Sequence, residues 1–301
     1  MKKGQTKSTF VWLFAVIAGG AFLLIFFTIT QAQQQYIDQQ VMSRNSDLLG
    51  DLIEILTSSE NTERTIPAPP QALEFNCIVG NHEFMYAQST LRNTVPPLPV
   101  FTPKTIPTRP YKAISMELNP GQPIGQGIFF VPEGYSIPVQ PNNQDVIDAI
   151  NESPFQYTES ENAPTIEYNK YRHSTGQIER NYGTVTYNDG ETVGWVGDTM
   201  LLGALITNSS TLYSCPANNV ERLLNVSYKI SIERAKNINN AQNGLDQTCG
   251  GIYDVIINRL ETTANSISFN PEDLERYTRN LEQVDDFIIR DVRRASCPSI
   301  Y

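Results

Sequence analysis

An uncharged apolar stretch near the start of the chain constrains its structure most strongly. Residues 10–29 read FVWLFAVIAGGAFLLIFFTI and contain no Asp, Glu, Lys or Arg. A helix rises about 1.5 Å per residue, so a stretch of this length crosses the hydrocarbon core of a bilayer, which is roughly 30 Å thick. We therefore expect a short tail over residues 1–9 and a transmembrane helix over residues 10–29.

The charges on either side of this span predict its orientation. Three lysines precede it, at positions 2, 3 and 7, and the flank TQAQQQYIDQQ after it has no Lys or Arg. The positive-inside rule places the N-terminus in the cytoplasm and residues 31–301 outside the cell membrane. An alternative is cleavage as a secretory signal near Ala32, because residues 30–32 resemble a small-x-small cleavage site.

A third possibility rests on the residues directly before the span. Lys3-Gly4-Gln5 resembles the class III, prepilin-type signals of archaeal pilins, with Thr9 where that family has an acidic residue. The resemblance implies cleavage after Gly4, with Gln5 as the first residue of the mature chain. It also implies self-assembly or partner binding through the N-terminal helix.

The segment behind the span has the pattern of an amphipathic helix. Within residues 30–57, apolar residues recur at steps of four and seven, at Ile37, Val41, Leu48, Leu52 and Leu56. This pattern predicts a helix with one apolar face that continues the membrane helix as a stalk. Residues 58–72 then form a linker, because three prolines between positions 67 and 70 interrupt helical structure.

Residues 73–198 are predicted to form a β-rich extracytoplasmic domain. Alternating or continuous apolar runs favour strands at residues 73–79, 113–118, 127–131 and 134–139, the last as an edge strand because it contains Pro138. Asn188-Asp189-Gly190 marks the turn of a hairpin over residues 184–195. Residues 145–150 suit a short helix, and His82–Tyr86 is interpreted as a loop.

Residues 199–301 are predicted to be a helical region that contains disulfides. The first helix is expected to start at Cys215-Pro216, with its apolar stripe at Val220, Leu223, Leu224, Ser227, Ile230 and Ile238. A second is expected over residues 250–267. A third begins at Asn270 as N-cap and Pro271 as first residue. The predicted fold class is α+β, with a long N-terminal transmembrane and stalk helix, a β-rich middle and C-terminal antiparallel helices.

The cysteines indicate an oxidising compartment. The chain has four, Cys77, Cys215, Cys249 and Cys297, all after the apolar span and with no C-x-x-C pair. An even set of this kind favours two disulfides over a zinc site. Three pairings are open, and antiparallel helices make Cys77–Cys215 and Cys249–Cys297 the easiest to form. Three N-glycosylation sequons also suit an exported chain, at Asn151, Asn208 and Asn225.

The C-terminal half carries a second resemblance. Residues 198–206 (DTMLLGALI), Tyr213-Ser-Cys215, residues 219–224 (NVERLL) and the ending SCPSIY resemble single-span surface proteins of archaea with a pilin-like N-terminal segment. This resemblance implies a β-rich middle and a cysteine-bearing helical end. It implies no activity.

The charge balance and the motifs argue against several functions. Apart from the three N-terminal lysines, 19 basic residues stand against 32 acidic ones, and such a surface repels nucleic acid. His82-Glu83 begins like a zinc-protease H-E-x-x-H helix, but Tyr86 occupies the second ligand position. His173 is the other histidine. We therefore predict no catalytic residue, cofactor or metal site, and a secreted hydrolase is a remote alternative.

An aromatic-rich region is the remaining candidate for binding. Tyr168, Tyr171, Tyr182, Tyr187 and Trp195 could form a surface for a glycan or a partner protein, although sheet packing also explains them. The sequence thus predicts a membrane-anchored extracytoplasmic protein of pilin-like build that is not an enzyme. It would act through protein–protein contacts, and an adhesion or binding module is the alternative.

Overall fold

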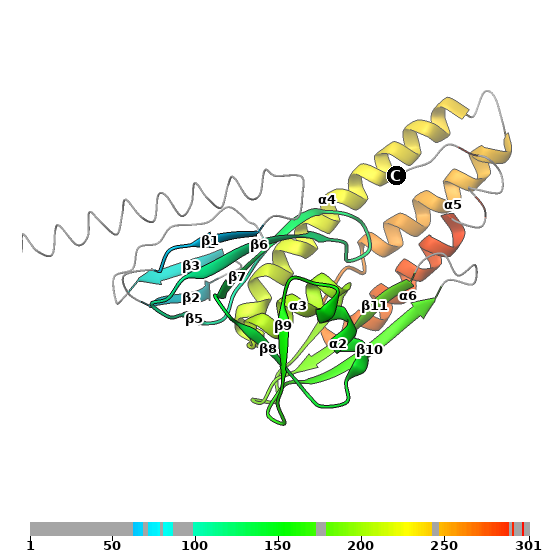
Figure 1. Cartoon of the computed structure of the whole chain (residues 1–301). Coiled ribbons are helices and arrows are strands. Elements are labelled where there is room, and N and C mark those ends of the chain that lie inside the picture. The colour runs from blue at the N-terminus through cyan, green and yellow to red at the C-terminus, as the bar shows by residue number, and fades with distance from the viewer. Residues whose placement is uncertain are drawn as a thin grey trace, which may run out of the picture. The chain divides into compact units, whose positions relative to one another are not determined.

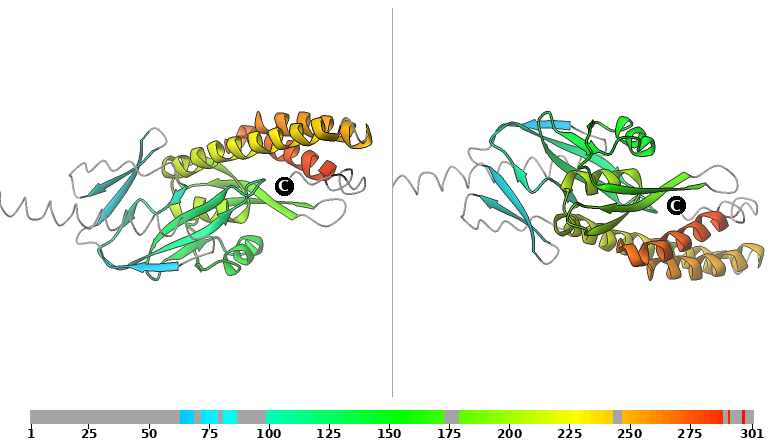
Figure 2. Two further views of the ribbon diagram at one scale, coloured as in Figure 1. Left: turned by 90° about the horizontal axis from the view of Figure 1, so that it is seen from above. Right: turned by 90° about the horizontal axis from the view of Figure 1, so that it is seen from below.

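A computed structural model of the chain describes residues 63–68, 72–78, 81–86, 99–172, 179–242 and 247–288, together with Asp291 and Cys297. These residues belong to one compact unit, Ile55–Tyr301, which is labelled in Figure 1 and seen from two further sides in Figure 2. Gly4, Gln5 and the N-terminal segments predicted over residues 10–29 and 30–57 lie outside the described residues.

The largest sheet has four strands in the order β1-β6-β7-β4. They are β1 (Glu63–Ile66), β6 (Tyr111–Leu118), β7 (Gly125–Pro132) and β4 (Val100–Phe101). Strands β6 and β7 pair antiparallel along their whole length, and β4 joins β7 in parallel. The last six residues of β7 are all buried, as expected of a strand covered on both faces. The strands predicted at residues 113–118 and 127–131 are confirmed.

A second sheet has three antiparallel strands, β10 (Thr165–Arg172), β11 (Glu179–Thr186) and β12 (Thr192–Val196). The predicted hairpin joins β11 to β12. In its turn the Gly190 N–H donates to the Tyr187 carbonyl at 2.9 Å, and the Tyr187 N–H donates to the Glu191 carbonyl at 2.9 Å. Gly190 has a φ of +86°, which glycine adopts without steric cost.

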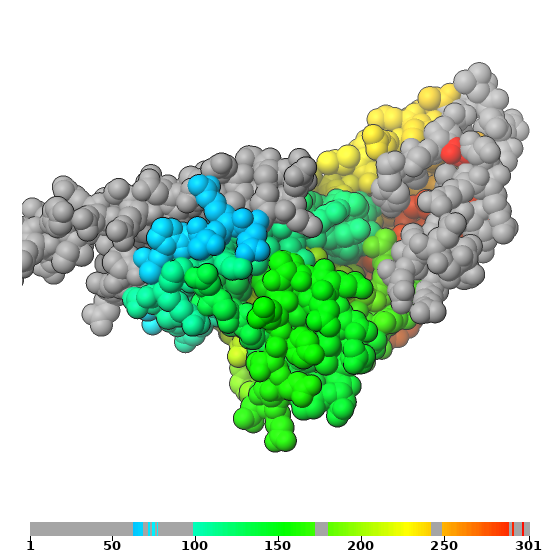
Figure 3. Space-filling view, in the orientation of Figure 1, coloured from blue at the N-terminus to red at the C-terminus, as the bar shows by residue number. Residues whose placement is uncertain are grey.

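Two smaller sheets complete the β structure. One contains β3 (Asn81–Tyr86), β2 (Leu73–Ile78) and β5 (Thr105–Ile106); the other pairs β8 (Ser136–Val139) with β9 (Gln156–Glu159) in parallel. Helix α2 (Gln144–Asn151) supplies the crossover that a parallel pair requires. The green atoms of β8, α2 and β9 lie in the lower half of Figure 3. The loop predicted over His82–Tyr86 is wrong, because these residues pair with β2 as strand β3.

Helix α3 (Asp198–Thr207) contacts both larger sheets, through β4, β6 and β7 on one side and β11 and β12 on the other. All eight residues from Met200 to Thr207 are buried, which suits a helix that is apolar on every side. Its close contact depends on Gly203, where an added Cβ would lie 2.3 Å from Cδ1 of Phe101. The β-rich and helical regions therefore share one hydrophobic core around α3.

Three longer helices follow: α4 (Ser210–Gln242), α5 (Gln247–Ala264) and α6 (Pro271–Phe287). Helix α5 packs against α4, and α6 packs against α5 and against strands β11 and β12. Figure 2 shows the yellow, orange and red helices side by side. Helix α6 starts where predicted, with Asn270 in extended conformation and Pro271 at the first position, and the Asn270 side chain makes no capping hydrogen bond.

Helix α4 starts earlier than the sequence indicated. Pro216, which was expected at its first turn, lies inside the helix. The start is set by Ser209, whose Oγ accepts a hydrogen bond from the Leu212 N–H at 3.5 Å. Asn208 closes α3 in the left-handed conformation, so only two residues separate the helices.

The structure contains two disulfide bonds. Cys77 of β2 is joined to Cys215 of α4, and Cys249 of α5 is joined to Cys297. This pairing is the one that the sequence predicted from antiparallel helices, and it is confirmed. The first bond spans 138 residues of sequence and ties the small sheet to α4, and the second spans 48.

The predicted fold class requires a correction. Among the helices that the structure describes, none is both long enough and apolar enough to cross a membrane. Helix α3 is apolar but has ten residues, about half of what a span needs, and α4 is long but carries charges such as Lys229 and Glu233. The described fold is a mixture of helices and strands linked by disulfides, and no membrane-spanning helix belongs to this described part of the chain.

Candidate functional site

Two of the five aromatic residues proposed as a binding surface lie in the core. Trp195 is fully buried, and its ring packs over Gly183, where Cζ2 lies 3.1 Å from the position of an added Cβ. Tyr187 is 4% exposed and donates its hydroxyl to the Ala204 carbonyl at 3.0 Å. These side chains join the second sheet to α3, so neither can belong to an exposed surface.

Tyr168 lies on the same face of the second sheet as Trp195 and is partly buried. The two rings are 5.1 Å apart, and the Tyr168 hydroxyl donates to the Asp198 carboxylate at 2.9 Å. Asn181 donates to both oxygens of Asp198, also at 2.9 Å. Burial and the Asp198 charge raise the pKa of Tyr168, which therefore stays protonated. The hydrogen bonds from Tyr168 and Asn181 to Asp198 position the first turn of α3, and the helix dipole stabilises the Asp198 carboxylate there.

Tyr171 and Tyr182 lie on the opposite face of the sheet, beside α6. The Tyr171 hydroxyl donates to Asp286 at 2.9 Å, and burial together with this bond raises its pKa. Burial and the nearby Glu282 charge likewise raise the pKa of Tyr182. Both tyrosines are partly exposed. This face can offer aromatic rings and hydrogen-bond donors, but its tyrosines are not poised for proton transfer.

A buried ion pair fixes this face to α6. Arg180 Nε lies 2.6 Å from Asp285 Oδ2, with side chains 17% and 7% exposed. Burial and the Asp286 charge raise the pKa of the adjacent Glu282.

Across the described residues, no group of three or more His, Cys, Asp or Glu side chains is suited to hold a metal ion.

The outer face of α4 is the clearest exposed apolar surface. Val226 and Ile230, one helical turn apart, are 55% and 64% exposed. Among the described residues, Val255 at 40% is the only other large apolar side chain so exposed. A shallow groove follows along the same helix, lined by Lys229, Ile230, Glu233, Arg234, Asn237, Ile238 and Ala241.

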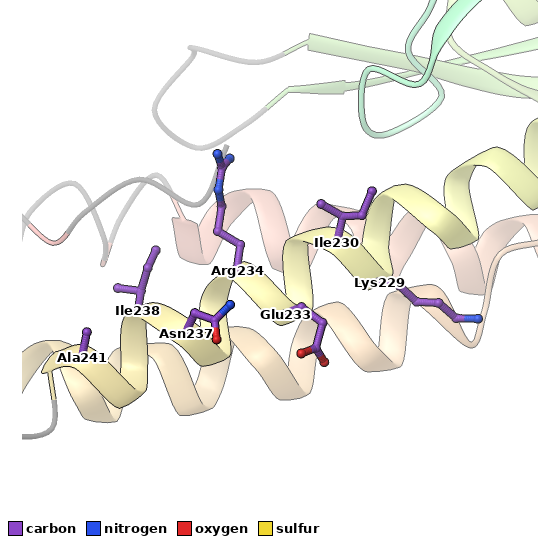
Figure 4. A pocket seen from close by; sticks show the side chains of 7 residues that line it. All are labelled: Lys229, Ile230, Glu233, Arg234, Asn237, Ile238 and Ala241. Atoms are coloured by element: carbon purple, nitrogen blue, oxygen red, sulfur yellow. The ribbon is translucent and has the colours of Figure 1, made fainter.

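Figure 4 shows how the residues of this groove are arranged. Ile230, Arg234 and Ile238 point to one side of α4, whereas Lys229 and Glu233 point to another. Apolar side chains are thus bordered by both signs of charge. We call Val226, Ile230 and the groove residues the α4 outer face.

The sequence missed this surface because it placed Ile230 on the buried stripe. In the structure the buried positions are Val220, Leu224, Tyr228, Ile232 and Ala235, and Ile230 lies off that row. The signal was present in the spacing: Val226 and Ile230 are four residues apart and two residues out of phase with Leu224 and Tyr228. Phase, and not hydrophobicity alone, distinguishes the two faces.

The other predicted residues cannot be assigned a role from the geometry. His82 belongs to β3 and pairs in register with Cys77, but its side chain is not described, and His173 lies outside the described residues. Gly4 and Gln5, the predicted processing site, also lie outside them.

Comparison of the chain with protein-family models, with curated proteins and with solved structures finds no match. The structure itself defines the chain as a mixed α and β unit joined by two disulfides, with an exposed apolar helix face.

Proposed function

We propose that this chain is an extracytoplasmic surface protein that acts through protein–protein contacts. The observation that carries the proposal is the exposure of Val226 and Ile230 on the α4 outer face. Fully burying such a side chain contributes about 1.5–3 kcal/mol of favourable free energy, and two side chains exposed to water on one helix turn do not make this contribution. A partner that covers both side chains gains this free energy on binding.

The disulfides support the extracytoplasmic location. Both bonds involve buried sulfur: Cys215 is fully buried, and Cys249 and Cys297 are 5% and 9% exposed. Disulfides of this kind persist in oxidising compartments and are rare where thiols are kept reduced. The proposed partner is a protein that presents a helix with apolar side chains, because a neighbouring helix fills a groove along a helix axis.

Photo-crosslinking in the native cell tests this proposal. A photoreactive amino acid at position 230 should give an adduct of defined mass with a partner, and the adduct should disappear when Val226→Asp is added. The matched control places the same amino acid at Glu275 of α6, whose side chain is 78% exposed on another helix. If position 230 gives no more adduct than position 275, the α4 outer face is not a contact surface.

Glycan binding is a second candidate because Tyr171 and Tyr182 expose part of their rings beside Asp286 and Glu282. Aromatic faces and carboxylates together suit a sugar, which has apolar C–H faces and hydroxyl donors. Tyr182→Ala is the informative variant, since replacing the buried Trp195 would disturb the core. Glycan-array binding that is lost in Tyr182→Ala, with the fold retained, would favour this function; a silent array would remove it.

A further inference from the structure

The three N-glycosylation sequons occupy different structural settings. Asn151 is the last residue of α2, Asn208 closes α3, and Asn225 lies within α4. Transfer of a glycan requires a free amide nitrogen on the Asn and leaves a bulky polar group that only an exposed position accommodates. The structure therefore discriminates between the three.

Asn225 is not suited to carry a glycan. Its Nδ2 donates to the Glu221 carbonyl at 3.0 Å within the helix, and the side chain is partly buried. The sequon hydroxyl, Ser227 Oγ, donates to Gln122 Oε1 at 2.8 Å and so faces another segment of the protein. A glycan here would break the first bond and crowd the contact with Gln122.

Asn151 is exposed, but its sequon hydroxyl is engaged. Ser153 Oγ donates to the Ile150 carbonyl at 2.6 Å and accepts the Phe155 N–H at 3.2 Å. These bonds terminate α2. The sequon is therefore part of a local turn in which the serine has a structural role.

Asn208 meets both requirements and, unlike Asn151, belongs to a sequon whose serine hydroxyl is also free among the described residues. It is exposed, and neither its side-chain amide nor the Ser210 hydroxyl makes a hydrogen bond within the described part of the chain. Its backbone is left-handed, with φ 47° and ψ 34°, which directs the chain through the two-residue connection between α3 and α4. The backbone N–H is already satisfied by Ala204 O at 3.2 Å, so a change at the side chain leaves the helix cap intact.

We propose that Asn208 is an N-glycosylation acceptor, an inference that rests on the proposed extracytoplasmic location. The donor is an oligosaccharide linked to a lipid phosphate. Asn208 Nδ2 forms a bond to the anomeric carbon and loses one proton, while the bond from that carbon to the phosphate oxygen breaks. The lipid phosphate leaves with the electron pair, the released proton passes to the solvent, and no oxidant or reductant is required.

Peptide mass spectrometry of the full chain from its native cells tests the assignment. Cleavage after Lys and Arg separates the sequons, because Asn208 lies between Arg180 and Arg222, whereas Asn225 lies between Arg222 and Lys229. A glycan mass is expected on the peptide 181–222 and not on the peptide 223–229. A bare 181–222 peptide, or a glycan found only at Asn151 or Asn225, overturns the proposal.

Two variants at one position supply the control. Ser210→Ala destroys the sequon and should abolish the adduct, whereas Ser210→Thr preserves the hydroxyl and should keep it. Because the Ser210 hydroxyl makes no hydrogen bond among the described residues, neither change should impair folding. An adduct that survives Ser210→Ala would show that the modification is not sequon-directed N-glycosylation.

The state of the cysteines separates failure of this inference from failure of the proposed location. Alkylation of the same sample before and after reduction reports whether all four cysteines are paired. Oxidised cysteines with a bare Asn208 refute the glycan alone. Four reduced cysteines and a bare Asn208 refute the extracytoplasmic location as well.

Discussion

Gly203 offers the sharpest test of how α3 packs in the core. An added Cβ would lie 2.3 Å from Cδ1 and 2.4 Å from Cε1 of Phe101. The Phe101 ring is fully buried and stacks on Phe129 with a centroid distance of 4.9 Å, so it has little room to move away. Gly203→Ala therefore inserts a methyl group where the core has no space.

The expected magnitude is the sum of two opposing effects. Replacing Gly by Ala inside a helix stabilises it by about 1 kcal/mol. Overpacking a core costs about 1–3 kcal/mol, and the confined ring of Phe101 points to the upper end. The free energy of unfolding of Gly203→Ala should thus fall by about 2 kcal/mol, equivalent to a decrease in Tm of about 4–8 °C.

Gly251 of α5 is the matched control. It is also a helical glycine, but it is exposed and an added Cβ would meet nothing within 4 Å. Gly251→Ala should raise the free energy of unfolding by up to about 1 kcal/mol. Reversible urea unfolding of the oxidised full chain, followed by circular dichroism, measures both variants under one condition.

The sign of the effect decides the outcome. If Gly203→Ala stabilises the chain as Gly251→Ala does, the contact between α3 and β4 is not as described. A third measurement isolates Phe101: in a Phe101→Ala background the ring is gone, so Gly203→Ala should become neutral or stabilising. An undiminished cost in that background would place the clash elsewhere.

Two further predictions concern charged side chains. Arg180→Met leaves Asp285 as a buried charge without this partner and should lower the free energy of unfolding by about 3 kcal/mol. The control is Arg279→Ala, which removes the ion pair with Glu275, whose side chains are 64% and 78% exposed. It should lower the free energy of unfolding by less than about 1 kcal/mol in the same urea titration. Burial raises the pKa of Glu221 above its ordinary value of 4.5, so the folded chain binds this proton more tightly than the unfolded chain, and stability falls as the pH rises from 4.5 through the folded-state pKa. Glu221→Gln retains an acceptor for the Phe269 N–H and should therefore raise stability at pH 7 but not below pH 4.5; equal effects at both pH values would contradict this reasoning.

Local sequence signals predicted the elements whose ends they mark. Asn270 and Pro271 identified the start of α6, and Asn188-Asp189-Gly190 identified the β11–β12 turn. These signals act through the backbone of a few neighbouring residues, so they hold in most tertiary settings. The disulfide pairing was also accessible, because it follows from the direction in which successive helices run.

What the sequence did not predict depends on contacts between distant segments. The central position of α3 could be predicted only if it were known that two sheets cover this helix. The burial of Trp195 and Tyr187 follows from that arrangement. Tyrosine and tryptophan at strand positions are equally consistent with an exposed aromatic surface and with a core. The start of α4 was misplaced because the prediction relied on Pro216 as a start signal, whereas in the structure Pro216 lies inside the helix and Ser209 precedes its first residue.

The exposed fractions on α4 also limit what the α4 outer face can contribute to binding. Covering Val226 and Ile230, which are 55% and 64% exposed, is worth about 2–3 kcal/mol together. A micromolar complex needs about 8 kcal/mol after the entropic cost of association has been met. These two residues can therefore form the centre of an interface but not the whole of it. Lys229, Glu233 and Arg234 border them, and complementary charges there would speed association and select the partner more than they would add affinity.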